Sequence, residues 1–209
     1  MVLDSKREQV RFVLDPLAQR LVNVEPDTIS YVALALAGLA GLLFFLSWEW
    51  IALLPLAAVV VIVSGLFDAL DGKVAKMTGK ASRRGDFLDH VLDRYADVLM
   101  IGGVAVSGWC DPYLGMLAIV GVLLTSYMGT QAQAVGAKRM YAGLLGRADR
   151  VVLMFIFPLM QYLMVVIDGR YIDLAVIELT LMEVMMLWFA IIGNLTAVQR
   201  AHSTFKSIR

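Results

Sequence analysis

Six long apolar stretches constrain the fold of this chain more than any other feature of its sequence. They cover about residues 28–46, 51–78, 86–107, 113–137, 150–167 and 174–199. Each is near or above the roughly 20 residues that a helix needs to cross a hydrocarbon core. Unpaired backbone groups are costly in lipid, so helices are expected and a sheet is not. With 60% hydrophobic and 17% charged residues, the chain is predicted to be an all-α integral membrane protein with six transmembrane helices.

The residues before the first stretch have the pattern of a helix that lies along the membrane surface. Apolar side chains recur there at helical spacing, opposite Arg7, Arg11 and Arg20: Val10, Val13, Leu14, Leu17 and Leu21. An amphipathic juxtamembrane helix is therefore expected within residues 1–25, although a solvent-exposed cap helix would show the same pattern. No signal peptide is expected. No linker or repeat divides the rest, which predicts a single domain over residues 1–209.

The basic residues predict the orientation in the membrane. If both termini lie inside, all of the 18 basic residues except Arg170 fall on the cytoplasmic side. The positive-inside rule then predicts a multi-pass protein of the plasma membrane, with both termini and any site near those loops facing the cytoplasm. The formal net charge is zero, so nothing indicates a nucleic-acid partner, and the single cysteine, Cys110, excludes an intrachain disulfide.

Acidic residues are concentrated in the second and third stretches. Carboxylates within apolar helices are costly and mark functional sites by default. At about 100° per residue, Asp68 and Asp71 lie about 60° apart around the second helix. Four aspartates of the third helix fall within about 80° of one another by the same count: Asp86, Asp89, Asp93 and Asp97. Two acidic stripes can therefore face each other.

This arrangement favours a site for hard metal ions. Four carboxylates held together repel one another unless cations are present, and two divalent ions would neutralise them. Oxygen ligands favour Mg²⁺ or Mn²⁺, which commonly bind substrate phosphates. One alternative is a structural salt-bridge network with neighbouring basic residues: Lys73, Lys76, Arg83, Arg84 and Arg94. Another alternative is a cation-coupled transporter. Two observations argue against it: the acidic residues crowd toward one membrane face, and the sequence has no inverted repeat.

The acidic region also resembles a family signature. The pattern Asp68-x2-Asp71-Gly72-x2-Ala75-Lys76-x8-Gly85-x3-Asp89-x3-Asp93 is similar to that of the CDP-alcohol phosphotransferases, in which an arginine stands where this chain has Lys76. Lysine keeps the charge but lacks the bidentate fork. The six-span pattern resembles this family too. The resemblance implies a homodimeric membrane enzyme that transfers a lipid phosphate from a CDP-activated lipid to a small alcohol and releases CMP.

The resemblance also implies roles for individual residues. Asp68, Asp71 and Asp89 would bind two Mg²⁺ or Mn²⁺ ions, and Asp93 would be a further ligand or the base that takes the proton of the acceptor hydroxyl. The CDP donor would be bound by Asp68 and Asp71 together with residues of the same motif: Gly72, Ala75, Lys76 and Gly85. A short family element at the first span is similar to Pro26, Asp27 and Ser30, which would also bind the donor. Helix capping explains those last three equally well.

Basic residues of the other cytoplasmic regions are candidates for binding the acceptor. Arg147 and Arg150 lie one turn apart, so both could reach one anion, which favours a phosphate-bearing acceptor. The predicted acceptor site comprises Lys138, Arg147, Arg150 and Arg200. Membrane anchoring is the alternative for these residues.

The identity of the acceptor rests on a resemblance. Residues 126–134 and 146–150 resemble the archaeal branch of the family known as archaetidylinositol phosphate synthases. This favours inositol 1-phosphate as acceptor, with glycerol 3-phosphate as the second choice, and CDP-archaeol or CDP-diacylglycerol as donor. The roles of Asp86, His90 and Asp97 remain open at this level, although His90 suits a hydrogen-bond partner of a metal ligand.

Overall fold

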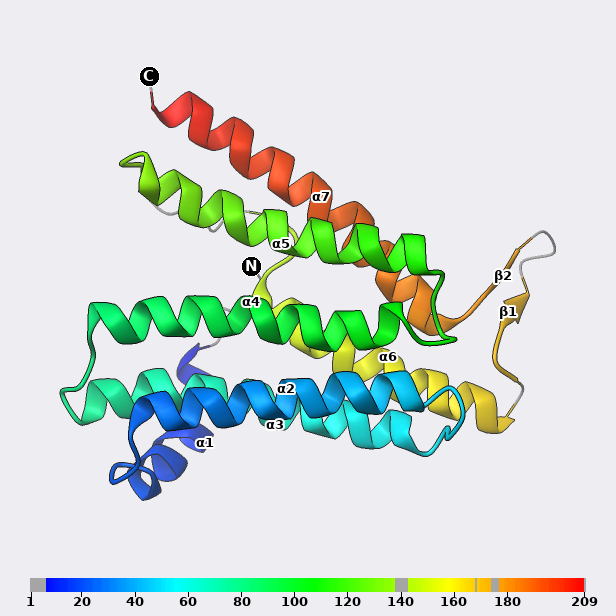
Figure 1. Ribbon diagram of the computed structural model, residues 1–209, viewed down its shortest axis with the longest axis horizontal. Helices are drawn as coiled ribbons and strands as arrows, with labels where there is room; N and C mark the ends of the chain where they lie inside the picture. Colours follow the sequence, from blue (N-terminus) through cyan, green and yellow to red (C-terminus); the bar gives the residue numbers. More distant parts are fainter. Residues whose placement is uncertain (1–6, 138–142, 168, 174–176, 209) are drawn as a thin grey trace.

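The computed structural model describes residues 7–137, 143–167, 169–173 and 177–208, with side chains from Leu14 onward, and shows a bundle of long helices (Figure 1). The helices are α1 (Arg7–Arg20), α2 (Pro26–Leu46), α3 (Leu53–Met77), α4 (Arg83–Ala105), α5 (Pro112–Ala134), α6 (Arg147–Ile167) and α7 (Leu181–Ser207). The predicted all-α class is confirmed. The expectation of no sheet was wrong in one loop, where β1 (Ile172–Asp173) pairs antiparallel with β2 (Glu178–Leu179).

The helices also confirm a multi-pass membrane protein. Within the described residues, five helices are long and apolar enough to cross a bilayer: α2, α3, α5, α6 and α7. The predicted third span corresponds to α4, whose aspartates and arginines keep it below that degree of apolarity. The predicted start of the last span, residue 174, lies outside the described residues. Its helix begins at Leu181, because Thr180 and Glu183 form a capping box there.

Glycines bring α2 and α4 into direct backbone contact. A Cβ placed on Gly41 would lie 2.2 Å from the carbonyl oxygen of Leu99, and one on Gly103 would lie 2.1 Å from that of Gly41. Small residues permit such close crossings between membrane helices, where packing replaces the hydrophobic effect as the driving force. This crossing fixes α4 alongside α2 (Figure 1), and so places the acidic half of α4 beside the bundle formed by α2 and α3.

Gly103→Ala is expected to destabilise the protein by about 1–3 kcal/mol, because the added methyl group meets packed backbone that cannot move aside. The midpoint of thermal unfolding in detergent should fall by several degrees, at roughly 2–4 °C per kcal/mol for a chain of this size. Gly102→Ala is the matched control, since a Cβ at the neighbouring glycine would meet nothing within 4 Å. Equal midpoints for the two variants would contradict the close crossing.

The predicted amphipathic segment forms α1, which packs against the end of α3 that carries the acidic residues. Ala18 and Leu17 lie in a small apolar cluster with Leu70 and Val74 of α3. An ion pair between Lys73 and Asp15 joins the same two helices. This helix therefore covers one side of the α3 segment on which the candidate site is built.

Candidate functional site

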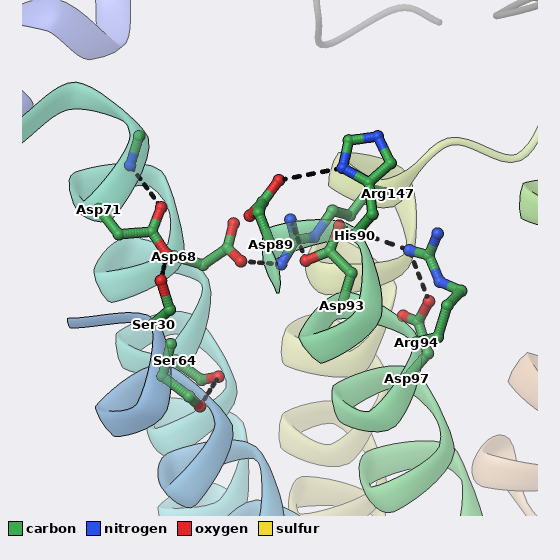
Figure 2. Close-up of polar contacts among 12 residues, drawn as sticks. Ser30, Ser64, Asp68, Asp71, Asp89, His90, Asp93, Arg94, Asp97 and Arg147 are labelled. Atoms are coloured by element: carbon green, nitrogen blue, oxygen red, sulfur yellow. Dashed lines mark hydrogen bonds and ion pairs between the residues drawn. The ribbon is translucent and has the colours of Figure 1, made fainter. Parts of the chain in front are cut away.

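Carboxylates from α3 and α4 converge near the turn that joins these helices. Asp68, Asp71 and Asp89 each offer one oxygen atom, and the three atoms lie within 4.8 Å of one another. Figure 2 shows Asp68 of α3 pointing toward the carboxylates of α4, with Asp71 beside Ser30. The turn between the helices includes Gly79, whose φ of +68° favours glycine. The two acidic helix faces meet as their spacing predicts.

One hydrogen bond from the start of α2 and one from α3 itself fix Asp71. The Ser30 hydroxyl donates to Asp71 Oδ2 at 2.5 Å, and the Gly72 backbone N–H donates to Asp71 Oδ1. Ser30 therefore contacts a candidate metal ligand directly. Pro26 and Asp27 lie in the first turn of α2, where a proline suits the helix start and an acid suits the helix dipole, so the helix terminus accounts for both of them.

A guanidinium from α6 reaches the carboxylates from the other side. Arg147 is the first residue of α6. It forms an ion pair with Asp68, and its Nη1 lies 2.5 Å from Asp93 Oδ1. The predicted base and one predicted metal ligand thus share a single arginine (Figure 2). Arg147, with Arg94 at 3.5 Å from Asp93, brings two positive charges to the four carboxylates gathered here, which leaves room for a further cation.

The ion pairs continue along α4 away from the metal ligands. Arg94 Nη2 lies 3.5 Å from Asp93 Oδ2 and 3.2 Å from Asp97 Oδ2. Arg150 of α6 donates hydrogen bonds to Asp97, from Nε at 3.2 Å and from Nη2 at 2.8 Å. Arg147 and Arg150, predicted to meet one anion together, therefore contact different carboxylates. The salt-bridge alternative describes Asp97, whereas Asp71 and Asp89 remain grouped as possible cation ligands.

His90 lies beside the carboxylates, whereas Arg200, a predicted acceptor residue, lies apart from them. His90 Nδ1 is 3.6 Å from Asp89 Oδ2 and 3.8 Å from Asp86 Oδ1. Both distances are longer than a hydrogen bond. Arg200 is buried between α5 and α7, where its Nη1 donates to the Thr125 carbonyl at 2.6 Å. Lys138 lies outside the described residues.

The predicted donor residues at the end of α3 face open space. A Cβ on Gly72 would meet nothing within 4 Å, so protein packing does not require a glycine there. Lys76, one turn further, is exposed, and Ala75 is half-buried. At Gly85 a Cβ would make an ordinary contact of 3.5 Å with Ser82 Oγ, the cap of α4. This surface next to the carboxylates therefore has room for a bound group.

A small cavity lies between α2, α3, α4 and α6 at this site and opens to the surface, with room for about one water molecule. Its lining divides into a polar set, Ser30, Ser64, Asp68, Asp71, Asp89 and Arg147, and an apolar set, Ala33, Leu34, Leu92 and Ala96. An oxygen-only donor set beside a half-apolar cavity fits Mg²⁺ or Mn²⁺, which prefer carboxylate ligands and are commonly shared with phosphates.

Comparison with known proteins gives consistent matches along most of the chain. The family described as CDP-alcohol phosphatidyltransferase matches residues 23–196. The archaetidylinositol phosphate synthase of Methanothermobacter thermautotrophicus is 30% identical over 200 residues, or 95% of this chain and 92% of the relative. That of Pyrococcus horikoshii is 28% identical over 160 residues, or 76% of this chain and 82% of the relative.

Solved structures of a bacterial relative share the fold. The phosphatidylinositol phosphate synthase of Mycobacterium tuberculosis with CDP-DAG bound has a TM-score of 0.73 and 25% identity, covering 93% of this chain and 94% of the relative. The same enzyme in complex with manganese and citrate has a TM-score of 0.74 and 25% identity, covering 93% of this chain and 90% of the relative.

Proposed function

We propose that this chain, which belongs to the CDP-alcohol phosphatidyltransferase family, transfers a lipid phosphate from CDP-archaeol or CDP-diacylglycerol to the hydroxyl of inositol 1-phosphate and releases CMP. The observation that carries the proposal is the convergence of Asp68, Asp71 and Asp89 within 4.8 Å. The names of the archaeal relatives support the acceptor, and the CDP-DAG complex of the bacterial relative supports the donor class.

The metal would be held by the converging carboxylates. Asp68, Asp71 and Asp89 would bind Mg²⁺ or Mn²⁺, and four negative charges with Asp93 suit two ions. When bound, such ions neutralise the donor diphosphate and the charge that develops at phosphorus. The manganese complex of the bacterial relative supports a divalent cation. Ser30, which donates a hydrogen bond to Asp71, would orient this ligand.

Asp93 would act on the acceptor. A hydroxyl that attacks phosphorus must lose its proton, and a carboxylate beside the metal ligands can accept it. Arg147 lies 2.5 Å from Asp93, so an acceptor whose phosphate binds Arg147 would place its hydroxyl near this base. The apolar wall of the cavity, from Ala33 to Ala96, would limit the access of water, which would otherwise compete as the nucleophile.

The donor would extend from the carboxylates over the open end of α3. Gly72 and Ala75 would leave space for the cytidine and its ribose, with Gly85 across the turn. Lys76 would meet the diphosphate as a point charge rather than as a fork. Pro26 and Asp27 would support this surface from the start of α2, where Ser30 already contacts Asp71.

The topology proposed for this function has six spans. α4 would cross the membrane with its polar face toward the site, as the sixth span beside the five apolar helices. Both termini and the site would face the cytoplasm in the plasma membrane, with α1 along the membrane surface. Two such protomers would form a homodimer.

A panel of acceptors tests the function. Purified protein with Mg²⁺ and CDP-diacylglycerol is expected to release CMP at least about tenfold faster with inositol 1-phosphate than with free inositol or serine, because only the phosphorylated acceptors can pair with Arg147. Glycerol 3-phosphate is the second candidate with the same chemistry, and the comparison of rates decides between the two. EDTA should abolish CMP release and excess Mg²⁺ restore it. A higher rate with serine or free inositol would contradict the proposed acceptor class.

A further inference from the structure

The side chain of Arg147 lies inside the carboxylate site rather than beside it. It lines the cavity together with Asp68, Asp71 and Asp89. Its two terminal nitrogens point in different directions, Nη2 to Asp68 and Nη1 to Asp93 (Figure 2). Asp68 therefore belongs both to the group of three carboxylates and to the ion pair with Arg147.

A guanidinium and a divalent cation cannot share this carboxylate without cost. Both are positive, and charges a few ångströms apart repel strongly where the surroundings have low polarity. A metal ion bound by Asp68 would therefore compete with Arg147. The ion has the higher charge and would gain Asp71 and Asp89 as further ligands, whereas the guanidinium forms its ion pairs with Asp68 and Asp93.

We propose that Arg147 is an exchangeable counter-cation of the metal site. It pairs with Asp68 and Asp93 while no divalent ion is bound, and binding of the ion displaces it from Asp68 and makes its guanidinium available to the acceptor phosphate. This inference rests on the proposed metal site. The metal ion would then bind before the acceptor phosphate, because Arg147 becomes available to the phosphate only when the ion has displaced it.

The local structure allows the side chain to move while its helix stays fixed. The Gly146 backbone N–H donates to Asp149 Oδ2 at 2.8 Å, which holds the start of α6. The Arg147 side chain is 34% exposed, whereas that of Arg150, one turn away, is 4% exposed and is held by Asp97. Arg150 does not line the cavity. The two arginines thus form a matched pair, one exchangeable and one fixed.

The test is the affinity of the intact protein for Mn²⁺, measured in detergent by the electron paramagnetic resonance signal of the free ion. Arg147→Gln is expected to bind Mn²⁺ about tenfold more tightly than wild type, within the range of about 5- to 150-fold typical of coupling between sites. In EDTA its thermal midpoint should fall, since the carboxylates lose their counter-charge, and the increase produced by Mn²⁺ should exceed that of wild type. Arg150→Gln should leave the Mn²⁺ affinity within about twofold. The three hydrogen bonds that it affects go to Asp97, which is not one of the proposed metal ligands.

The possible outcomes separate the two proposals. Equal or weaker Mn²⁺ binding by Arg147→Gln, with wild type binding the ion, would overturn the exchange and leave the metal site in place. A wild-type protein that binds no Mn²⁺ would overturn the metal site and the exchange together. Arg147→Lys keeps the charge but lacks the fork, so its affinity should lie between those of wild type and Arg147→Gln. It provides the same test if the glutamine variant does not fold.

Discussion

Asp93→Asn is expected to slow CMP release by about 10²- to 10⁴-fold at saturating Mg²⁺, CDP-diacylglycerol and inositol 1-phosphate, which is the usual contribution of a positioned general base. The amide has nearly the shape of the carboxylate but cannot accept the proton of the acceptor hydroxyl. It also loses the charge that pairs with Arg147. The rate of CMP formation under single-turnover conditions measures the effect on the chemical step.

Two measurements make this test specific. Asp86→Asn is the matched control on the same helix, because its side chain is 79% exposed and its contact with His90 is 3.8 Å; its rate should stay within about twofold of wild type, as surface changes usually do. The Mn²⁺ affinity of Asp93→Asn separates a base from a ligand. Retained affinity supports the base, lost affinity supports a metal ligand, and an unchanged rate of CMP release would remove Asp93 from the chemistry.

Asp97→Ala is expected to lower the free energy of unfolding by about 3–5 kcal/mol, because it leaves a buried guanidinium without its partner. Within the described residues, the side chain of Arg150 donates its hydrogen bonds to Asp97, and Arg94 shares the same carboxylate. The thermal midpoint in detergent should fall by roughly 10 °C. This is the largest effect on stability expected from a single change in the site region.

The double variant Asp97→Leu with Arg150→Met is the control for this prediction. Replacing both members of a buried ion pair by apolar side chains of similar volume is often neutral for stability. The double variant should therefore unfold well above Asp97→Ala, because Arg150 no longer carries a buried charge and Arg94 keeps its contact with Asp93. A wild-type midpoint for the single variant would show that Asp97 does not hold Arg150.

The aspartate site followed from the sequence because its geometry is local to two helices. Asp68 and Asp71 share a face of α3, and Asp89 and Asp93 share a face of α4, at spacings that the 3.6-residue period determines. Only a short turn joins the two helices, so they pack side by side and their acidic faces come together. The predicted ends of the helices differ from the observed ones mainly at α7, where the capping box at Thr180 decides the start.

The partners of the arginines did not follow from the sequence. Arg147 and Arg150 lie one turn apart on α6, which suggested one shared anion. Asp93 and Asp97 lie one turn apart on α4, so the two helices offer matching rows of opposite charge and each arginine takes its own carboxylate. The matching spacing is visible in the sequence, but it has meaning only once α6 is known to start beside α4. Ser30 likewise gains its contact with Asp71 only because α2 begins beside α3.

The sequence by itself determined that the chain lies in a lipid bilayer, that it forms long helices and that two rows of carboxylates face each other. These features depend on the length of apolar stretches and on helical periodicity, which involve residues close together along the chain. The tertiary structure decided which cation meets which acid, since ion pairs between helices depend on side-chain reach across distances that no local pattern encodes. It therefore separated Arg147, which shares Asp68 with the metal ligands, from Arg150, which is buried against Asp97.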